Sequence, residues 1–233
     1  METTTIVLIV VIIVLLYILY AYYSDSATQL VKTASLLTQI PPIKKISQPN
    51  NTRFGHSVWI YVNTWDNNVD KTILSRDKQF RLYLDKHSPT LKLDVYMNDD
   101  TNETMMITNN FPLQKWVNII ISMDNQFVDS YLDGKLVRSQ RFFKENTTTA
   151  GVVPAMPPGK EVALYLGNKD DSNKFDAYAS LLKRWTSPVD PKTAWDTYMK
   201  GNGSSRMASA LSDIGIDVSI LQNKEEIRKY SLM

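Results

Sequence analysis

Residues 6–23 form an uninterrupted apolar run, IVLIVVIIVLLYILYAYY, with no charged residue, no glycine and no proline. As an α-helix rising about 1.5 Å per residue, this run is roughly 27 Å long, close to the roughly 30 Å hydrocarbon core of a bilayer. A helix also satisfies its own backbone hydrogen bonds in lipid. The sequence therefore predicts a single transmembrane helix within residues 1–25. The residues assigned to this membrane anchor are Ile6, Val10, Val14, Tyr17, Tyr20 and Tyr23.

A cleaved signal peptide is the alternative interpretation of this run. It requires a basic start, a shorter apolar core and a cleavage site with small residues. Residues 1–5 are METTT and carry no lysine or arginine, and the apolar run is too long. The sequence favours an uncleaved anchor.

The orientation of the anchor is indicated by two opposing signals. Lys32, Lys44 and Lys45 follow the apolar run, whereas no basic residue precedes it. The positive-inside rule then places the rest of the chain on the cytosolic side, in agreement with the absence of cysteine. Sequons for N-glycosylation favour the opposite orientation, and they begin at Asn50, Asn102, Asn146 and Asn202.

Composition limits the remaining part of the chain to one sizeable domain. About 210 residues follow the anchor, with charges of both signs interspersed and a formal net charge of +2. No basic stripe of the kind that binds nucleic acid is present, so we expect no nucleic-acid partner. The short basic cluster at residues 183–185 is interpreted as a solvated strand end.

Residues 26–52 are expected to connect the anchor to the domain. Leu30, Ala34 and Leu37 recur at helical spacing, which predicts a juxtamembrane helix over residues 26–38. Two prolines at 41–42 end it, and the polar residues 44–52 are typical of a stiff, extended linker. Such a linker would hold the domain some tens of ångströms from the membrane at most.

From residue 53 the apolar period changes from helical to two. Asp133 and Gly134 lie between two alternating runs, which is a strong signal for a β-hairpin. Many short alternating segments separated by polar turns predict an antiparallel β-sandwich over residues 53–203. The expected strands cover residues 57–63, 80–84, 91–97, 105–108, 116–123, 127–132, 135–139, 162–167 and 177–185.

One short helix is expected after the last strand. Asp190 is its predicted N-cap, Pro191 lies in its first turn and Gly201 ends it. Its predicted apolar stripe consists of Trp195, Tyr198 and Met199. The C-terminal extension, residues 204–233, is ambiguous: residues 214–220 alternate like a strand, whereas residues 223–230 have a helical pattern.

Residues 116–125 and 131–134 carry the motifs W-x-N-x-x-x-S-x-D-N and Y-x-D-G. This combination resembles the central hairpin of laminin-G-like, concanavalin A-type jelly rolls. The resemblance covers about residues 53–202 and implies an all-β, antiparallel jelly-roll sandwich. The segments that fit the same family's first and last strands and its short helix are residues 57–61, 73–76, 163–167 and 198–201.

An N-terminal anchor before such a domain is similar to the architecture of concanavalin A-like proteins of large double-stranded DNA viruses. Some of those proteins are minor components of the virion shell. The resemblance implies a minor capsid-associated protein that links an internal membrane to the shell, with the bilayer and capsid proteins as partners. The alternative is a surface lectin that binds glycans through loops of the sandwich.

The catalytic signature of the family's glucanases is absent from this chain. Those enzymes carry Glu-x-Asp-x-x-Glu on one strand, and retaining hydrolysis needs two carboxyl groups about 5–5.5 Å apart. No glutamate here stands in that pattern, and the nearest acidic residues, Asp94 and Asp99–Asp100, are typical of strand and turn surfaces. With His56 and His87 as the sole histidines and no cysteine, a zinc site is not expected either. We expect no enzymatic activity, no cofactor and no metal.

Two polar clusters and one aromatic turn remain as binding hypotheses. Asp99–Asp100 with Asn102, and residues 170–176 with three aspartates and an asparagine, could supply calcium ligands, although both are also typical of polar turns. A glycan site needs an aromatic platform beside polar groups. The candidate glycan contacts are Trp65, Asp66, Asn67 and Asn68.

Overall fold

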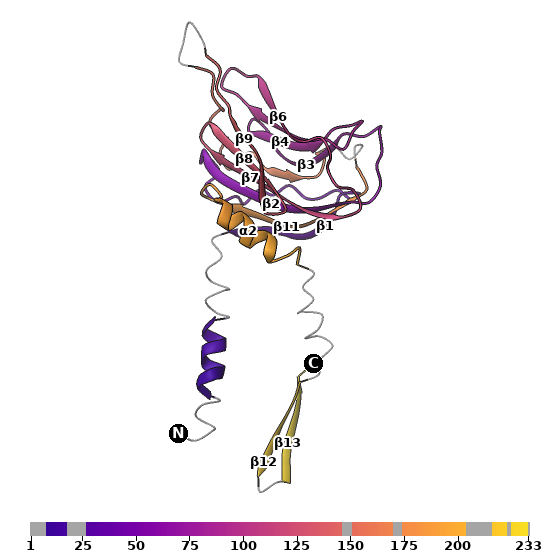
Figure 1. The fold of residues 1–233 in the computed structure, drawn as a ribbon, viewed down its shortest axis with the longest axis vertical. Helices are drawn as coiled ribbons and strands as arrows, with labels where there is room; N and C mark the ends of the chain where they lie inside the picture. The colour runs from indigo at the N-terminus through magenta and orange to yellow at the C-terminus, as the bar shows by residue number, and fades with distance from the viewer. Residues whose placement is uncertain are drawn as a thin grey trace.

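Two antiparallel β-sheets stacked face to face make up the body of the protein (Figure 1). One sheet has six strands in the order β1-β11-β2-β7-β8-β9, and the other has five in the order β10-β3-β4-β5-β6. The expected all-β antiparallel sandwich is confirmed, and it is consistent with a jelly roll. This computed structural model describes residues 8–17, 27–145, 151–169, 174–203, 216–222 and 225–232.

The strands of the sandwich follow the alternating pattern of the sequence. In β2, Val58 and Ile60 are buried between the sheets, whereas Trp59 and Tyr61 point to the outer face. The expected strands are all present, some with shifted ends. The bounds are β1 Thr28–Ser35, β2 Arg53–Val62, β3 Lys71–Arg76, β4 Phe80–Leu84, β5 Leu91–Tyr96, β6 Asn102–Thr108, β7 Trp116–Asp124, β8 Phe127–Leu132, β9 Lys135–Arg141, β10 Leu164–Leu166 and β11 Ala177–Trp185.

The predicted hairpin at Asp133–Gly134 joins β8 to β9. Both residues have positive φ, 48° and 75°, as a type I′ turn requires. A methyl group added to Gly134 would lie 3.0 Å from atoms of both Trp195 and Tyr198, which belong to the helix above the turn. Gly134 thus serves the turn and also lets the helix pack closely.

Gly134→Ala is expected to lower the free energy of unfolding by about 2–3 kcal/mol. A left-handed backbone costs a residue with a side chain about 1–2 kcal/mol, and contact with the helix adds to this cost. Gly201→Ala is the matched control, because Gly201 has a φ of 76° but has no atom within 4 Å of the added methyl group. Urea unfolding of both variants measures the difference. Equal losses would show that the helix contact is unimportant.

The helix, α2 (Pro191–Met199), begins and ends as predicted. The Asp190 side chain accepts hydrogen bonds from the backbone N–H groups of Lys192 and Thr193. The predicted apolar stripe is wrong for Trp195 and Met199, which are exposed, whereas Tyr198 is half-buried and stacks against Trp59. The fully buried residues of the helix are Ala194 and Thr197. The small side chains of Ala194 and Thr197 allow the helix axis to approach the sheet closely.

The helix expected over residues 26–38 is wrong, because residues 28–35 form β1 at the edge of the six-stranded sheet. Thr28 pairs with Arg184 and Ser35 pairs with Tyr178 of β11. The helix was predicted only from the spacing of three apolar residues within this segment. The strand instead obtains its backbone hydrogen bonds from a partner about 150 residues away in the sequence, which no local pattern reveals.

The extended linker expected over residues 44–52 is also wrong, because this segment is fastened to the sandwich. Ile43 exchanges two backbone hydrogen bonds with Leu164, at 2.9 and 3.0 Å. The Arg184 guanidinium donates to the carbonyl oxygens of residues 47 and 48, and Arg76 donates to that of residue 49. Arg184 is fully buried, so the solvated strand end expected at residues 183–185 is corrected as well. The folded body begins at Thr28 rather than at Arg53.

Part of the predicted anchor is described as a helix, residues 8–17. Val10, Val14 and Tyr17 lie in it with exposed side chains, whereas Ile6, Tyr20 and Tyr23 lie outside the described residues. Among the described residues, no helix has the length and apolar character needed to cross a membrane.

The C-terminal extension contains a β-hairpin of its own. Strand β12 (Ile216–Gln222) pairs with β13 (Glu225–Leu232) as a separate two-stranded sheet. The strand pattern of residues 214–220 is therefore confirmed in its described part. The helical interpretation of residues 223–230 is wrong for the described residues 225–230.

Candidate functional site

A polar cleft of about 460 Å³ lies on the outer face of the five-stranded sheet. It forms because alternation buries every second residue of these strands and turns the others outward. The strand register brings outward residues into one row that crosses all five strands. In the order of the strands, this row consists of Tyr165, Ser75, Arg81, Asp94 and Thr104.

Asp94 is held at the middle of this row by two hydroxyl groups. Thr104 Oγ1 donates to Asp94 Oδ1 at 2.6 Å, and the Tyr83 hydroxyl donates to the same oxygen at 3.3 Å. Burial, together with the charge of Asp94, raises the pKa of Tyr83 to about 12, so its hydroxyl remains a donor at neutral pH. Both bonds end on Oδ1, which leaves Oδ2 of the carboxylate as an acceptor for a ligand.

Arg81 faces Asp94 from the neighbouring strand and is positioned by other groups. Its Nε donates to Thr72 Oγ1 at 2.9 Å, and its NH2 group lies 3.5 Å from a carboxylate oxygen of Asp70. The guanidinium also stacks over the Tyr83 ring, 4.5 Å from the ring centroid. These contacts fix the plane of the guanidinium while leaving further N–H groups for a ligand.

The ends of the cleft carry amides and one aromatic ring. Tyr96 and Asn102 lie opposite each other in β5 and β6, and the Tyr96 hydroxyl donates to Asp100. At the other end, the Asn168 side chain accepts from the Thr72 N–H and donates to a backbone carbonyl at 2.6 Å. The cleft thus combines carboxylates, cationic donors, amides and an aromatic ring.

Among the residues that the structure describes, Asp94 has no carboxylate as a partner on the neighbouring strands. Its partners across the sheet are Arg81 and Thr104, and the next outward residues of β5 are Lys92 and Tyr96. The other two carboxylates that line the cleft are bound to cations, one to Arg81 and the other to Lys169. A retaining glycosidase needs two facing carboxyl groups about 5–5.5 Å apart.

The family model described as the concanavalin A-like lectin/glucanases superfamily matches residues 38–193, more than half of the chain. The chain belongs to this superfamily. The resemblance inferred from the central hairpin motifs is therefore confirmed at the level of the superfamily. A search of curated proteins found no match.

Solved structures similar to this superfamily member include receptor-binding domains of botulinum neurotoxins. The type G domain is 15% identical, with a TM-score of 0.48, and the match covers 65% of this chain and 38% of the toxin chain. The domain of mosaic serotype C/D is 10% identical, with a TM-score of 0.49, and coverages of 65% and 37%. The aligned region thus represents well under half of either toxin chain.

The aromatic turn at Trp65 is packed, although the sequence suggested it as a glycan platform. The Lys71 ammonium lies 4.0 Å from the centroid of the Trp65 ring, and the ring packs against the core. Trp65 Nε1 donates to Asn67 Oδ1, and the Asn68 N–H donates to Asp66 Oδ1. The four residues stabilise their own turn and lie apart from the cleft. Their contact with a glycan stays a prediction.

The polar clusters considered for calcium have structural roles in their turns. Asp99 accepts hydrogen bonds from the backbone and side chain of Thr101, and Asp176 accepts from Asn63 and Thr64. Residues 170–173 lie outside the described residues. Within the part of the chain that the structure describes, no group of three or more potential metal ligands was found.

The residues of the cleft that sequence reasoning missed did carry a signal. The outward positions of residues 80–84 and 91–97 include Arg81, Tyr83, Asp94 and Tyr96. These charged and aromatic residue types are well suited to binding a ligand. Only the pairing of β4 with β5 and β6 shows that these residues meet. The sequence alone does not show which strands pair, and this pairing is what brings the residues together into a site.

Proposed function

We propose that this protein is a non-enzymatic, membrane-anchored binding protein whose cleft on the five-stranded sheet binds a glycan. The observation that carries the proposal is the row of Arg81, Asp94 and Thr104, with Tyr96 beside it. Among the described residues, the strand partners of Asp94 are a cation and a hydroxyl group rather than a second carboxylate. A carboxylate flanked by a cation and hydroxyl groups, in a cleft whose two other described carboxylates are bound to cations, supports recognition of a ligand rather than hydrolysis.

The chemistry of the cleft suits a polyhydroxylated ligand. Sugar hydroxyl groups both donate and accept, so they would pair with Asp94 Oδ2 and with the N–H groups of Arg81. Tyr96 offers a half-exposed ring against which the apolar face of a sugar would pack. The volume of about 460 Å³ is within the range of about 300–1,000 Å³ for small-ligand sites.

The apolar N-terminal segment supports the membrane part of the proposal. All side chains of residues 8–17 are apolar or aromatic, and in the described helix all are exposed. Such a surface is costly in water and favourable in lipid. The continuous apolar run of residues 6–23 has the length required to span a bilayer.

Asp94→Ala is expected to reduce glycan binding at least tenfold, because it removes the central acceptor of the cleft. A glycan array probed with the purified full-length protein identifies the ligand, and titration with the best glycan gives the ratio of dissociation constants. Asn67→Ala is the matched control in the Trp65 turn. Binding that survives Asp94→Ala but is lost in Asn67→Ala would place the site in that turn. An array without any bound glycan would contradict the proposal.

The second candidate function is a minor capsid-associated protein that ties an internal viral membrane to its shell. The observation that favours it is β9, an edge strand with exposed side chains along most of its length. Leu136 and Val137 in β9, and Phe127 in the neighbouring β8, are exposed, and edge strands of this kind pair readily with other proteins. Cross-linking from a reporter at Val137 in purified particles would identify a shell protein. Absence of the chain from such particles would exclude this function.

A further inference from the structure

The outer face of the six-stranded sheet carries a row of aromatic side chains. Tyr178 of β11 lies directly opposite Tyr61 of β2, which lies opposite Trp116 of β7. The rings of Tyr61 and Trp116 are 5.7 Å apart between centroids, and Tyr178 is 42% exposed. Directly paired residues of neighbouring strands point to the same face, so the three rings form one continuous surface.

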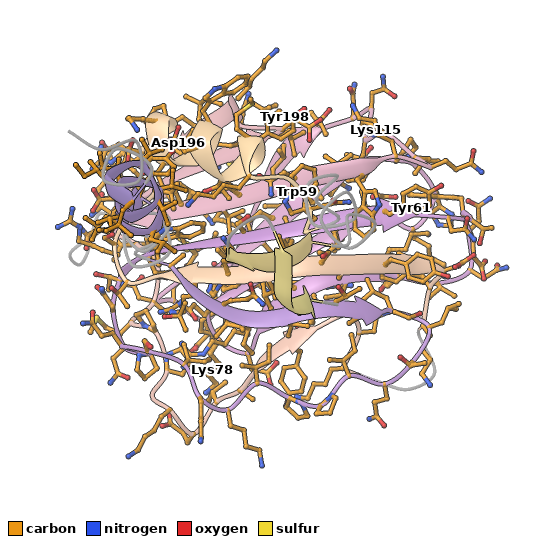
Figure 2. The ribbon with its side chains drawn as sticks, turned by 90° about the horizontal axis from the view of Figure 1, so that it is seen from below. Trp59, Tyr61, Lys78, Lys115, Asp196 and Tyr198 are labelled. Carbon is orange, nitrogen blue, oxygen red and sulfur yellow. The ribbon has the colours of Figure 1, made fainter. Side chains whose placement is uncertain are left out.

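Helix α2 extends the aromatic character of this face. Figure 2 looks onto the face and shows Tyr198 beside Trp59, with Tyr61 farther along β2. The rings of Trp59 and Tyr198 are stacked at 5.7 Å, and Trp195 lies 5.7 Å from Tyr198. Trp195 and Met199 are 44% and 65% exposed. Apolar surfaces of this kind on a soluble domain mark a contact with a partner or a membrane.

The chain length between the anchor and β1 limits where this sheet lies. The apolar run ends at Tyr23 and β1 begins at Thr28. The intervening residues 24–27, fully extended at about 3.5 Å per residue, span no more than roughly 17 Å. Because β1 is an edge strand of the six-stranded sheet, an anchored chain holds this sheet close to the bilayer surface.

We propose that the outer face of the six-stranded sheet rests on the membrane interface, with Tyr61, Trp116, Tyr178 and Trp195 at the level of the lipid headgroups. This inference rests on the membrane anchoring proposed above. Tyrosine and tryptophan favour that level because their rings are apolar and their N–H or O–H groups are hydrated. The five-stranded sheet is on the opposite side of the sandwich, so its cleft would face away from the bilayer.

Site-specific labelling tests this arrangement, because the chain contains no cysteine. Tyr178→Cys and Thr104→Cys are each made in the full chain, labelled with a small fluorophore and inserted into phosphatidylcholine vesicles. Residue 104 is exposed on the outer face of the five-stranded sheet and is the matched control. Lipids with a nitroxide on the headgroup are expected to quench the label at position 178 at least threefold more than the label at position 104.

The outcomes separate the inference from the anchor on which it rests. If the full chain does not float with the vesicles, the anchor proposal fails. If it floats but both labels are quenched equally, the face does not contact lipid and the inference is overturned. A label at position 178 that is protected from a water-soluble quencher but not quenched by lipid would indicate a protein partner and would also overturn it. Lys115→Cys, adjacent to Trp116 and exposed, replaces Tyr178→Cys if that variant does not fold.

Discussion

Replacement of Arg76 by methionine is expected to lower the free energy of unfolding by about 4 kcal/mol. The Arg76 side chain is 1% exposed, and its guanidinium donates to five acceptors at distances of 2.7–3.2 Å. Each acceptor left unsatisfied in a buried place costs about 1–3 kcal/mol, although entering water would recover part of this. Urea unfolding followed by tryptophan fluorescence measures the loss. The five acceptors are Gln79 Oε1 and the carbonyl oxygens of Pro49, Pro158, Gly159 and Val162.

Arg81→Met provides the matched control on the neighbouring strand. Its side chain is 38% exposed and its ion pair with Asp70 is partly solvated, so the expected loss of stability is below about 1 kcal/mol. The same variant removes a donor from the cleft and should weaken glycan binding. A similar loss of stability in both variants would contradict the role assigned to Arg76 in fastening the loops.

The strands were predictable because their signal is local. In residues 91–97 and 116–123, every second side chain is apolar, and one face of a strand in a sandwich must be buried. The turn at Asp133–Gly134 was also predictable from its own residues, because few residue types adopt positive φ without strain. These features depend on neighbours in the sequence and not on the rest of the fold.

Residues 28–52 were mispredicted because their structure depends on distant residues. The segment around residues 47–49 is polar and contains a proline, which in isolation is typical of a free linker. Arg184 and Arg76, which belong to other strands, donate to its carbonyl oxygens and hold it against the sandwich. A buried arginine in a strand has no local signature that distinguishes it from a solvated one.

The candidate site was missed for a similar reason. Trp65 stood out in the sequence because a tryptophan beside polar residues is typical of a sugar platform, but the Lys71 ammonium covers its ring. Asp94 was interpreted as a solvated strand residue. Its significance depends on Tyr83 and Thr104, which lie on the two neighbouring strands and are brought to it by the sheet register.

Stability is expected to fall by about 1.4 kcal/mol per pH unit as the pH decreases below about 6.5, because of His56. His56 is buried, and burial, followed by the charges of Arg184 and Arg76, holds its pKa well below the usual 6.5, although the nearby Lys183 backbone acts in the opposite direction. The pKa of Arg184, lowered to about 10 by burial and by Arg76, still leaves it charged at neutral pH. Its NH1 group lies 2.8 Å from His56 Nε2, which must accept this hydrogen bond and therefore carries no proton.

The sign of this dependence follows from proton binding in the two states. Between pH 6.5 and the lowered pKa of folded His56, the unfolded chain binds a proton that the native protein does not, so acidification favours unfolding. Urea midpoints measured from pH 7.5 to 5 should therefore decrease, in a range above the usual pKa of aspartate. In His56→Gln, whose amide oxygen accepts from Arg184 without titrating, the decrease should disappear, whereas His87→Gln, at an exposed position, should behave like the parent protein. A parent protein with constant stability over this range, or a His56→Gln variant with an unchanged decrease, would show that protonation of the buried imidazole does not control the acid sensitivity of the fold.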